Sequence, residues 1–512
     1  MVSRRTRRIV LAVLTAVFAF AGLGAWAIAS PVGAAPDDDY HLASIWCGLG
    51  DREGLCAPGD QPNERVVSER LIESSGCFAQ QSEKSAQCAL DDSRMISTER
   101  GNFVGAYPPV FYAVMSVFAT PDIAVSTVVM RLVNAGLFVG AVFSVLALLR
   151  PGQRGPIIWT SVVALVPLGV FIIPSVNPSS WALLAGLLVW VANYGYFTAT
   201  TLPRRIALGA ITVVIAVMGA GTRGDSAVFV AFAALAAMIL TFEKNRVWLK
   251  KAILSFAVIV IGAFFFLASG QSTGAAVATV TQGGATAVSA DELGAATESG
   301  MGLVFSNLLD LPWLWTGGTG TWGLGWFDTP LVKSVWVLMI GVLFAIVLWG
   351  LRVTSMRKGI VLILAFSALV VIPLYVLHGE GARVGDWVQP RYMLPLLIIL
   401  IGLAIYGFAH DHLGLSRLQA GVLFAAVALA NSLSLRNNMR RYITGTDVGG
   451  FNLNHNMEWW WDIPVSPMLV WFGGSGAFAL TLLGAWLWLY PKGVRPVPAQ
   501  EEISPELRRS IR

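Results

Sequence analysis

A series of apolar runs, each long enough to cross the hydrocarbon core of a bilayer, constrains this chain more than any other feature of its sequence. A transmembrane helix needs roughly 17 to 25 predominantly apolar residues. Such runs recur along nearly all of the 512 residues and are separated by short polar segments. The sequence therefore predicts an all-α integral membrane protein.

We expect about twelve transmembrane helices. Hydrophobic residues make up 55% of the chain and charged residues only 13%, and the mean hydropathy is +0.67, so no soluble domain of ordinary size is left over. The predicted spans are residues 9–29, 123–149, 156–174, 179–199, 206–221, 225–242, 252–270, 332–351, 360–378, 392–409, 418–435 and 468–490.

Basic residues cluster in short segments on alternating sides of these runs, which is the positive-inside pattern of a multi-pass cell-membrane protein. The pattern places both termini in the cytoplasm and most acidic residues outside. The net charge of +5 therefore does not indicate a nucleic-acid-binding surface. The segments assigned to the cytoplasm are 4–8, 150–154, 204–205, 244–251, 352–358 and the tail from 492.

Residues 1–490 are predicted to form a single polytopic domain in the lipid bilayer, followed by a disordered cytoplasmic tail at 491–512. The first run precedes Val32–Ala35, which is similar to a signal-peptidase cleavage site. The run is longer than the ~7–15 residues of a signal-peptide core, so we favour a retained helix. The predicted outer segments are 30–105, 271–331 and 436–467.

A short apolar stretch follows the first outer segment. It begins after Pro108 and Pro109 and closes at Pro121. Proline is favoured in the first turn of a helix, and the stretch is too short to span a bilayer. We expect residues 106–120 to form a re-entrant or interfacial helix.

All four cysteines lie in the segment 30–105, outside the membrane, where disulfides form and persist. Two disulfides are expected, and the sequence does not choose among the three possible connectivities. A zinc site is disfavoured because no tight Cys-x-x-Cys pair is present. The cysteines are Cys47, Cys56, Cys77 and Cys88.

Three adjacent carboxylates, Asp37, Asp38 and Asp39, follow the first span, and His41 lies two residues further on. Adjacent carboxylates repel one another, which raises at least one pKa or attracts a divalent cation. Such a carboxylate could be the general base for an acceptor hydroxyl, with His41 orienting it or sharing the proton. The alternative is a solvated acidic cap after a helix.

Arginines at the outer ends of spans could bind a lipid phosphate. Arg391 is the best placed, because it begins a span and Tyr392 beside it could anchor the interface. Arg223 and Arg131 are further candidates. The alternatives are that the arginines snorkel to the interface, or that Arg223 pairs with Asp225.

Tryptophans gather in two outer segments. They are typical of an aromatic belt at the membrane interface, although aromatic faces also line sugar sites. Between two earlier spans, the hydroxyls after Asn177 and Pro178 are expected to cap a helix. The tryptophans are Trp313, Trp315, Trp322, Trp326 and Trp459–Trp461.

These segments resemble an uncharacterised family of multi-spanning membrane proteins, domain of unknown function 2142, which is similar to the C-type glycosyltransferase superfamily. The family tends to show Pro-Asp-Glu-Pro-x-His after its first helix. Here Pro36, Asp37 and His41 match this motif, whereas Asp38 and Asp39 replace the glutamate and the second proline. The resemblance covers most of residues 1–410 and is completed by Pro108-Pro109-Val110-Phe111-Tyr112, Arg131-Leu132, Asn177-Pro178-Ser179, and Arg391-Tyr392 with Pro395.

The resemblance implies transfer of a sugar from a polyprenyl-phosphate carrier to a cell-envelope glycan acceptor on the outer face. Asp37 would be the base, and outer arginines would hold the lipid phosphate. Because Asp38 stands where the family has glutamate, its implied role is to position the acceptor or a divalent cation. No further cofactor is implied.

Two other classes of function stay open. A lipid or solute transporter would place charged residues deep within its spans, and almost none lie there in this sequence. A non-catalytic subunit of an envelope-assembly complex would need none of the outer charges.

Overall fold

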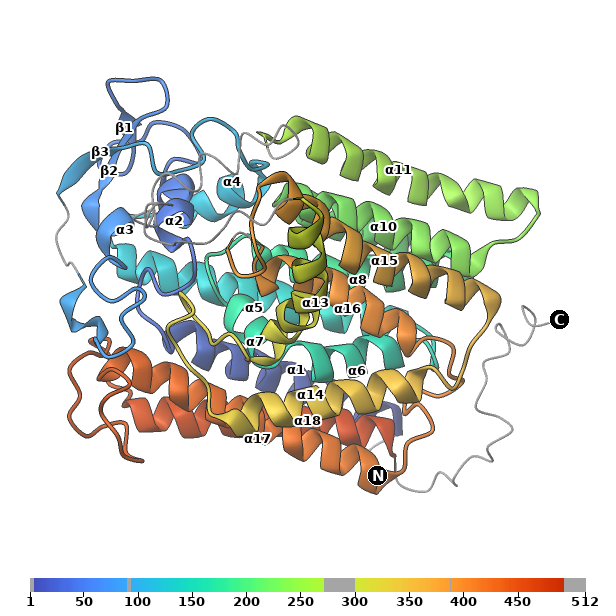
Figure 1. Ribbon diagram of the computed structural model, residues 1–512. Coiled ribbons are helices and arrows are strands. Elements are labelled where there is room, and N and C mark those ends of the chain that lie inside the picture. Colours follow the sequence, from blue (N-terminus) through green and yellow to red (C-terminus); the bar gives the residue numbers. More distant parts are fainter. Residues whose placement is uncertain (1–3, 90–93, 271–299, 387, 492–512) are drawn as a thin grey trace.

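The computed structural model describes residues 4–89, 94–270, 300–386 and 388–491, and helices dominate this part of the chain (Figure 1). Ten helices in the described ranges are long and apolar enough to cross a membrane. They coincide with ten predicted spans, which confirms an all-α integral membrane protein. They are α1 (Arg4–Ile28), α5 (Ile123–Leu148), α8 (Ser179–Thr198), α9 (Leu202–Ala220), α10 (Gly224–Thr241), α11 (Arg246–Ala268), α14 (Lys333–Gly350), α15 (Met356–Gly379), α17 (Arg417–Ile443) and α18 (Pro467–Leu489).

Two predicted spans are shorter helices than expected. The span 156–174 is divided into α6 (Gly155–Ala164) and α7 (Leu168–Ile172). Pro167 lies directly before α7, and proline interrupts a continuous helix because it has no N–H and a fixed φ angle. The span 392–409 is α16 (Pro390–Ala404), which begins on a proline. A count of twelve full-length spans is therefore corrected at these two positions.

Helices α1 and α18 lie antiparallel in the bundle. A Cβ atom at Gly484 would meet Thr15, and one at Gly474 would meet Ala25. The beginning of α1 and the end of α18 therefore lie on the same side, as predicted for the two termini. That this side is the cytoplasm stays a prediction. Packing of α1 against α5 and α18 also favours a retained helix over a signal peptide.

The first outer segment has more regular structure than the sequence predicted, and it lies at one end of the helical bundle (Figure 1). All residues of α2 (Asp38–Trp46) are buried. Helix α4 lies within 106–120 and is short, as expected. The other elements are α3 (Glu69–Glu73), the 3-10 helix η1 (Ala86–Cys88), α4 (Val110–Ser116) and an antiparallel sheet of β1 (Ala57–Pro58), β2 (Arg65–Ser68) and β3 (Met95–Thr98).

The two later outer segments also contain helix. Helix α13 (Met301–Thr316) and the 3-10 helix η3 (Gly317–Thr319) fall within 271–331, of which 271–299 lie outside the described residues. Helix α17 continues to Ile443, beyond its predicted end at 435. Its last turn carries Arg440 and Arg441, and basic side chains there are favoured by the helix dipole. The predicted tail lies outside the described residues except for Pro491.

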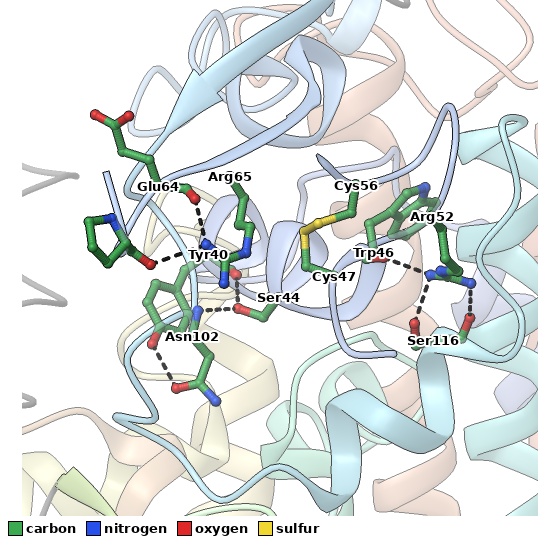
Figure 2. Close-up of a disulfide and its surroundings, with 11 residues drawn as sticks. Tyr40, Ser44, Trp46, Cys47, Arg52, Cys56, Glu64, Arg65, Asn102 and Ser116 are labelled. Carbon is green, nitrogen blue, oxygen red and sulfur yellow. Dashed lines mark hydrogen bonds between the residues drawn. A yellow bond between two sulfur atoms is a disulfide. The ribbon is translucent and has the colours of Figure 1, made fainter. Parts of the chain in front are cut away.

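The structure pairs Cys47 with Cys56 and Cys77 with Cys88, which selects one of the three connectivities. Figure 2 shows how the first disulfide closes a loop that carries Arg52. The Arg52 guanidinium donates to the carbonyl of Trp46 and to Ser116 of α4, with N–O distances of 2.6 to 3.0 Å. This loop therefore joins the end of α2 to α4.

Introduced cysteines provide a test of sidedness, because all four native cysteines are in disulfides. We expect Asp60→Cys and Gly449→Cys to react with a membrane-impermeant maleimide added to intact cells. Lys244→Cys and Thr354→Cys should react only after the membrane is opened. External labelling at Lys244, or protection of Asp60, would contradict the predicted topology.

Candidate functional site

The three adjacent aspartates are separated by the geometry of α2, so that each lies near a different arginine. Asp37 precedes the helix with φ of 59°, a left-handed conformation that aspartate adopts more readily than most residues. Asp38 and Asp39 form the first turn, where successive side chains point about 100° apart. The alternative of a solvated acidic cap does not describe Asp38 and Asp39, because both are buried.

Asp37 is paired with Arg391 at the start of α16. The Arg391 Nη2 atom lies 2.5 Å from Asp37 Oδ2 and also donates to the Tyr392 hydroxyl at 2.8 Å. The Arg391 side chain is only 3% exposed, yet its Nε and Nη1 atoms have no hydrogen-bond partner. Leaving buried N–H groups unpaired is unfavourable, so these donors are suited to an anion.

Asp38 lies on the opposite side of α2, towards α1 and α5. Its Oδ2 atom accepts from the backbone N–H of Ala35 at 3.0 Å and lies 4.0 Å from Arg131. Arg131 donates to the carbonyls of Ala27, Ser30 and Pro31, just after the apolar part of α1. Because these carbonyls occupy its guanidinium, Arg131 joins α5 to the end of α1 and the residues after it.

Asp39 is paired with Arg100, a residue that the sequence did not single out. The Arg100 Nε and Nη2 atoms donate to the two carboxylate oxygens at 2.8 and 3.1 Å. The two residues are separated by 61 positions in the chain, and both side chains are largely buried. No local pattern marks such a pair, which depends on how the outer segment folds back over α2.

The raised pKa expected in the acidic cluster is found at Asp38 and not at Asp37. Burial raises the pKa of Asp38 to about 7, since Arg131 only partly offsets the loss of water. Burial is the largest single influence on the pKa of Asp37 and acts to raise it. Arg391 and the smaller contributions of His41, Arg100 and Arg223 together outweigh burial and hold this pKa below its ordinary value. The sequence predicted a raised pKa at the candidate base. For Asp37 in the protein without substrate this prediction is wrong, because its pKa is lowered.

His41 lies in α2, like Asp38 and Asp39, and is surrounded by aromatic rings. Its Nδ1 atom is 3.0 Å from the hydroxyl of Tyr112 in α4, and Tyr40 and Tyr107 contact its ring edge to face. Burial lowers the pKa of His41 to about 3, so its imidazole is neutral at pH 7. A neutral, buried imidazole can orient a neighbour but is a poor acceptor of a proton.

Arg223 supports Arg391 through Tyr392. Its Nε and Nη2 atoms each lie 2.9 Å from a carboxylate oxygen of Asp225, as one of the sequence alternatives proposed. The guanidinium of Arg223 lies 4.3 Å from the centre of the Tyr392 ring, and that of Arg391 lies 4.8 Å from it. Tyr392 therefore contacts both cations, and such cation–π contacts stabilise the position of both.

Asn177 fixes the backbone next to the candidate base. Its Nδ2 atom donates to the carbonyl of Pro36 at 2.9 Å, while its Oδ1 atom accepts from the backbone N–H of Ser179. The expected hydroxyl cap is not formed, because the Ser180 hydroxyl donates to the carbonyl of Ile173 and the amide oxygen of Asn177 accepts from the first turn of α8 instead. Asn177 also contacts the acidic segment, 141 positions away. The turn between α7 and α8 helps to set where Asp37 lies.

A small cavity borders this site. It is lined by Pro36, Pro390 and Arg391, by Leu168 of α7, by Gly317 of η3, and by residues that follow η3, including Trp322 and Phe327. In the described residues, no group of three or more His, Cys, Asp or Glu side chains could hold a metal ion. The site thus combines a carboxylate, a buried guanidinium with vacant donors, and aromatic rings.

The fold and this site define a polytopic α-helical membrane protein with a buried charged centre at one end of its bundle. Residues 20–400 match the family model described as "Predicted membrane protein (DUF2142)". The chain belongs to this family, which confirms the resemblance seen in the sequence. The family description names no reaction, and no curated protein matches the chain.

Stability against pH provides a test of the Asp38 environment. A carboxyl whose pKa rises from 3.8 to about 7 on folding stabilises the protein below pH 3.8, and this contribution is lost as pH rises towards 7. As the pH rises from 5 to 8, wild type should lose this contribution, whereas Asp38→Asn has no carboxyl to titrate. The melting temperature of Asp38→Asn in detergent should therefore rise relative to that of wild type over this range. A constant difference between the two proteins across this range would show that the pKa is not raised.

Proposed function

We propose that this protein is a membrane glycosyltransferase, which moves a sugar from a polyprenyl-phosphate donor to a cell-envelope acceptor on the outer face. One observation carries the proposal: the buried guanidinium of Arg391 has vacant donors directly beside the carboxylate of Asp37. An anion-binding group next to a base is what this transfer needs.

The lipid phosphate binds to the vacant side of Arg391. A guanidinium has five N–H donors, and the Nη2 atom is already used by Asp37 and Tyr392. The Nε and Nη1 hydrogens remain for phosphate oxygens. Hydrogen bonds between a guanidinium and phosphate are short and strong, and they gain further strength where water is excluded.

Binding of the donor activates the base. In the free protein, Arg391 keeps the pKa of Asp37 low, which makes this carboxylate a weak base. The phosphodiester of the donor carries one negative charge, which offsets part of the positive charge of the same guanidinium, so the pKa of Asp37 rises. The Asp37 carboxylate therefore becomes a stronger base when the donor is bound.

The transfer step is balanced without a cofactor. The Asp37 carboxylate takes the proton of an acceptor hydroxyl, and the acceptor oxygen forms a bond to the anomeric carbon of the sugar. The bond between that carbon and the phosphate oxygen breaks, and the electron pair leaves with the polyprenyl phosphate. Arg391 stabilises the charge that develops on this leaving group.

The other predicted residues act on position. Neutral His41 holds Tyr112, Asp38 fixes the start of α2, and Arg223 acts through Tyr392. Asp38 is 0% exposed, so it does not contact the acceptor or a cation in this mechanism. A donor dissolved in the bilayer also suits a chain with ten candidate membrane spans among its described residues.

Asp37→Asn tests the base. Asparagine retains the volume and also tolerates a left-handed conformation, but it cannot take up the proton. We expect transfer of labelled sugar from a polyprenyl-phosphate carrier in membranes to fall by about a hundredfold or more, the usual contribution of a general base. Asp51→Asn, an exposed carboxylate in the same outer segment, should be unaffected.

Full activity of Asp37→Asn, at a normal protein level and melting temperature, would exclude Asp37 as the base. Absence of sugar transfer by wild-type membranes would favour the transporter or the non-catalytic subunit.

Arg391→Lys and Arg391→Ala test the phosphate site. Lysine keeps the charge but loses the planar set of donors, so we expect a partial loss of affinity for undecaprenyl phosphate, and a loss of about tenfold or more with alanine. Exposed Arg383→Ala is the control. Equal, small effects of both Arg391 variants would indicate an arginine that only packs at the interface.

A further inference from the structure

The cavity beside Arg391 has an aromatic wall that the proposed chemistry does not yet use. We propose that Trp322 and Phe327 bind the sugar ring of the donor, while Arg391 binds its phosphate. This inference rests on the proposed function and names the part of the site that distinguishes a glycosylated carrier from a bare one.

The placement of the two rings supports a sugar subsite. Trp322 and Phe327 line the same cavity as Arg391, and their ring centres are 5.6 Å apart with planes at 65°. At this distance and angle the two rings pack edge to face, and both residues line the cavity. The face of an aromatic ring carries partial negative charge, which suits the weakly positive C–H groups of a sugar ring.

Phe327 is held in an unfavourable state. Its φ angle is 62°, a left-handed conformation that is uncommon for a bulky residue, and 41% of its surface is exposed. Neither the left-handed backbone conformation nor the exposure of the ring stabilises the fold. Strained, exposed residues that the surrounding structure nevertheless fixes are enriched at binding sites.

The neighbours of Phe327 supply this fixation. Trp326 donates from its indole N–H to the carbonyl of Gly33 at 2.9 Å, close to the acidic segment. Asp328 pairs with Arg441 at 2.7 Å, and both of these side chains are at most 2% exposed. The residues on each side of Phe327 are therefore anchored, and the ring between them is presented to the cavity.

Trp322 is fixed in a similar way. Its indole N–H donates to the carbonyl of Trp313 at 2.9 Å. A Cβ atom at Gly317 would lie 2.2 Å from Pro390, the residue before Arg391, so glycine allows this segment to approach the start of α16. The close approach brings the aromatic wall next to the guanidinium.

Trp313 fits the predicted aromatic belt at the membrane interface, whereas Trp322 and Phe327 line the cavity beside Arg391. Trp313 lies on the surface of α13 and is 53% exposed. It does not line the cavity with Arg391. Trp313 is therefore a matched control for an aromatic side chain in the same outer segment.

The experiment compares the affinity of purified full-length protein for undecaprenyl phosphate and for undecaprenyl-phosphate-glucose, measured by thermal shift in detergent. Wild type should bind both lipids and prefer the glucosylated one. Phe327→Ala should weaken binding of the glucosylated lipid about three- to tenfold and leave the bare lipid unchanged. Trp322→Phe, which keeps a ring, should lose less, and Trp313→Ala should lose nothing.

The outcomes separate the two proposals. If wild type binds bare lipid phosphate but shows no preference for the glucosylated lipid, or if Phe327→Ala keeps that preference, the sugar subsite is wrong while the phosphate site stands. Equal weakening of both lipids by Phe327→Ala would likewise overturn the subsite. If wild type binds neither lipid, the proposed function and this inference both fail.

Discussion

Two buried carboxylates in the first turn of α2, with a third that is partly buried directly before them, are the constraint on which this end of the protein depends. Removing a charge from water is costly unless a counter-charge and hydrogen bonds replace the water. Here the compensation comes from three separate places: Arg391 of α16, Arg131 of α5, and Arg100 of the first outer segment. The acidic segment therefore joins the bundle to the outer structure, and its geometry is set by both.

The same arrangement gives each carboxylate a different chemistry. Asp37 pairs with Arg391, whose Nε and Nη1 atoms have no hydrogen-bond partner. Asp39 pairs with Arg100 through both carboxylate oxygens. Asp38 has a pKa of about 7 and one oxygen without a hydrogen-bond partner. A substrate anion can change the electrostatic state of only the first of these. In this proposal Asp37 is catalytic, whereas Asp38 and Asp39 stabilise the structure. The three neighbours differ because their side chains point in different directions at the start of α2.

The sequence predicted those features that depend on local pattern. Hydrophobic run length located the spans, and the position of Asp37 and Arg391 at outer ends placed both residues in one candidate site. It did not predict the pairs of Asp39 with Arg100 or of Asp328 with Arg441, since these residues are 61 and 113 positions apart. The low pKa of Asp37 was missed for the same reason: repulsion between neighbours is visible in a sequence, whereas the arginine that overrides it is not.

The central claim is that Arg391 receives the phosphate of a lipid carrier beside Asp37. The most direct test is an electron cryo-microscopy structure of the full-length protein in nanodiscs that contain undecaprenyl phosphate. The account predicts phosphate density about 3 Å from Arg391 Nη1 or Nε, at the cavity that Trp322 and Phe327 line. An occupied phosphate elsewhere, with Arg391 still bound only to Asp37 and Tyr392, would contradict it.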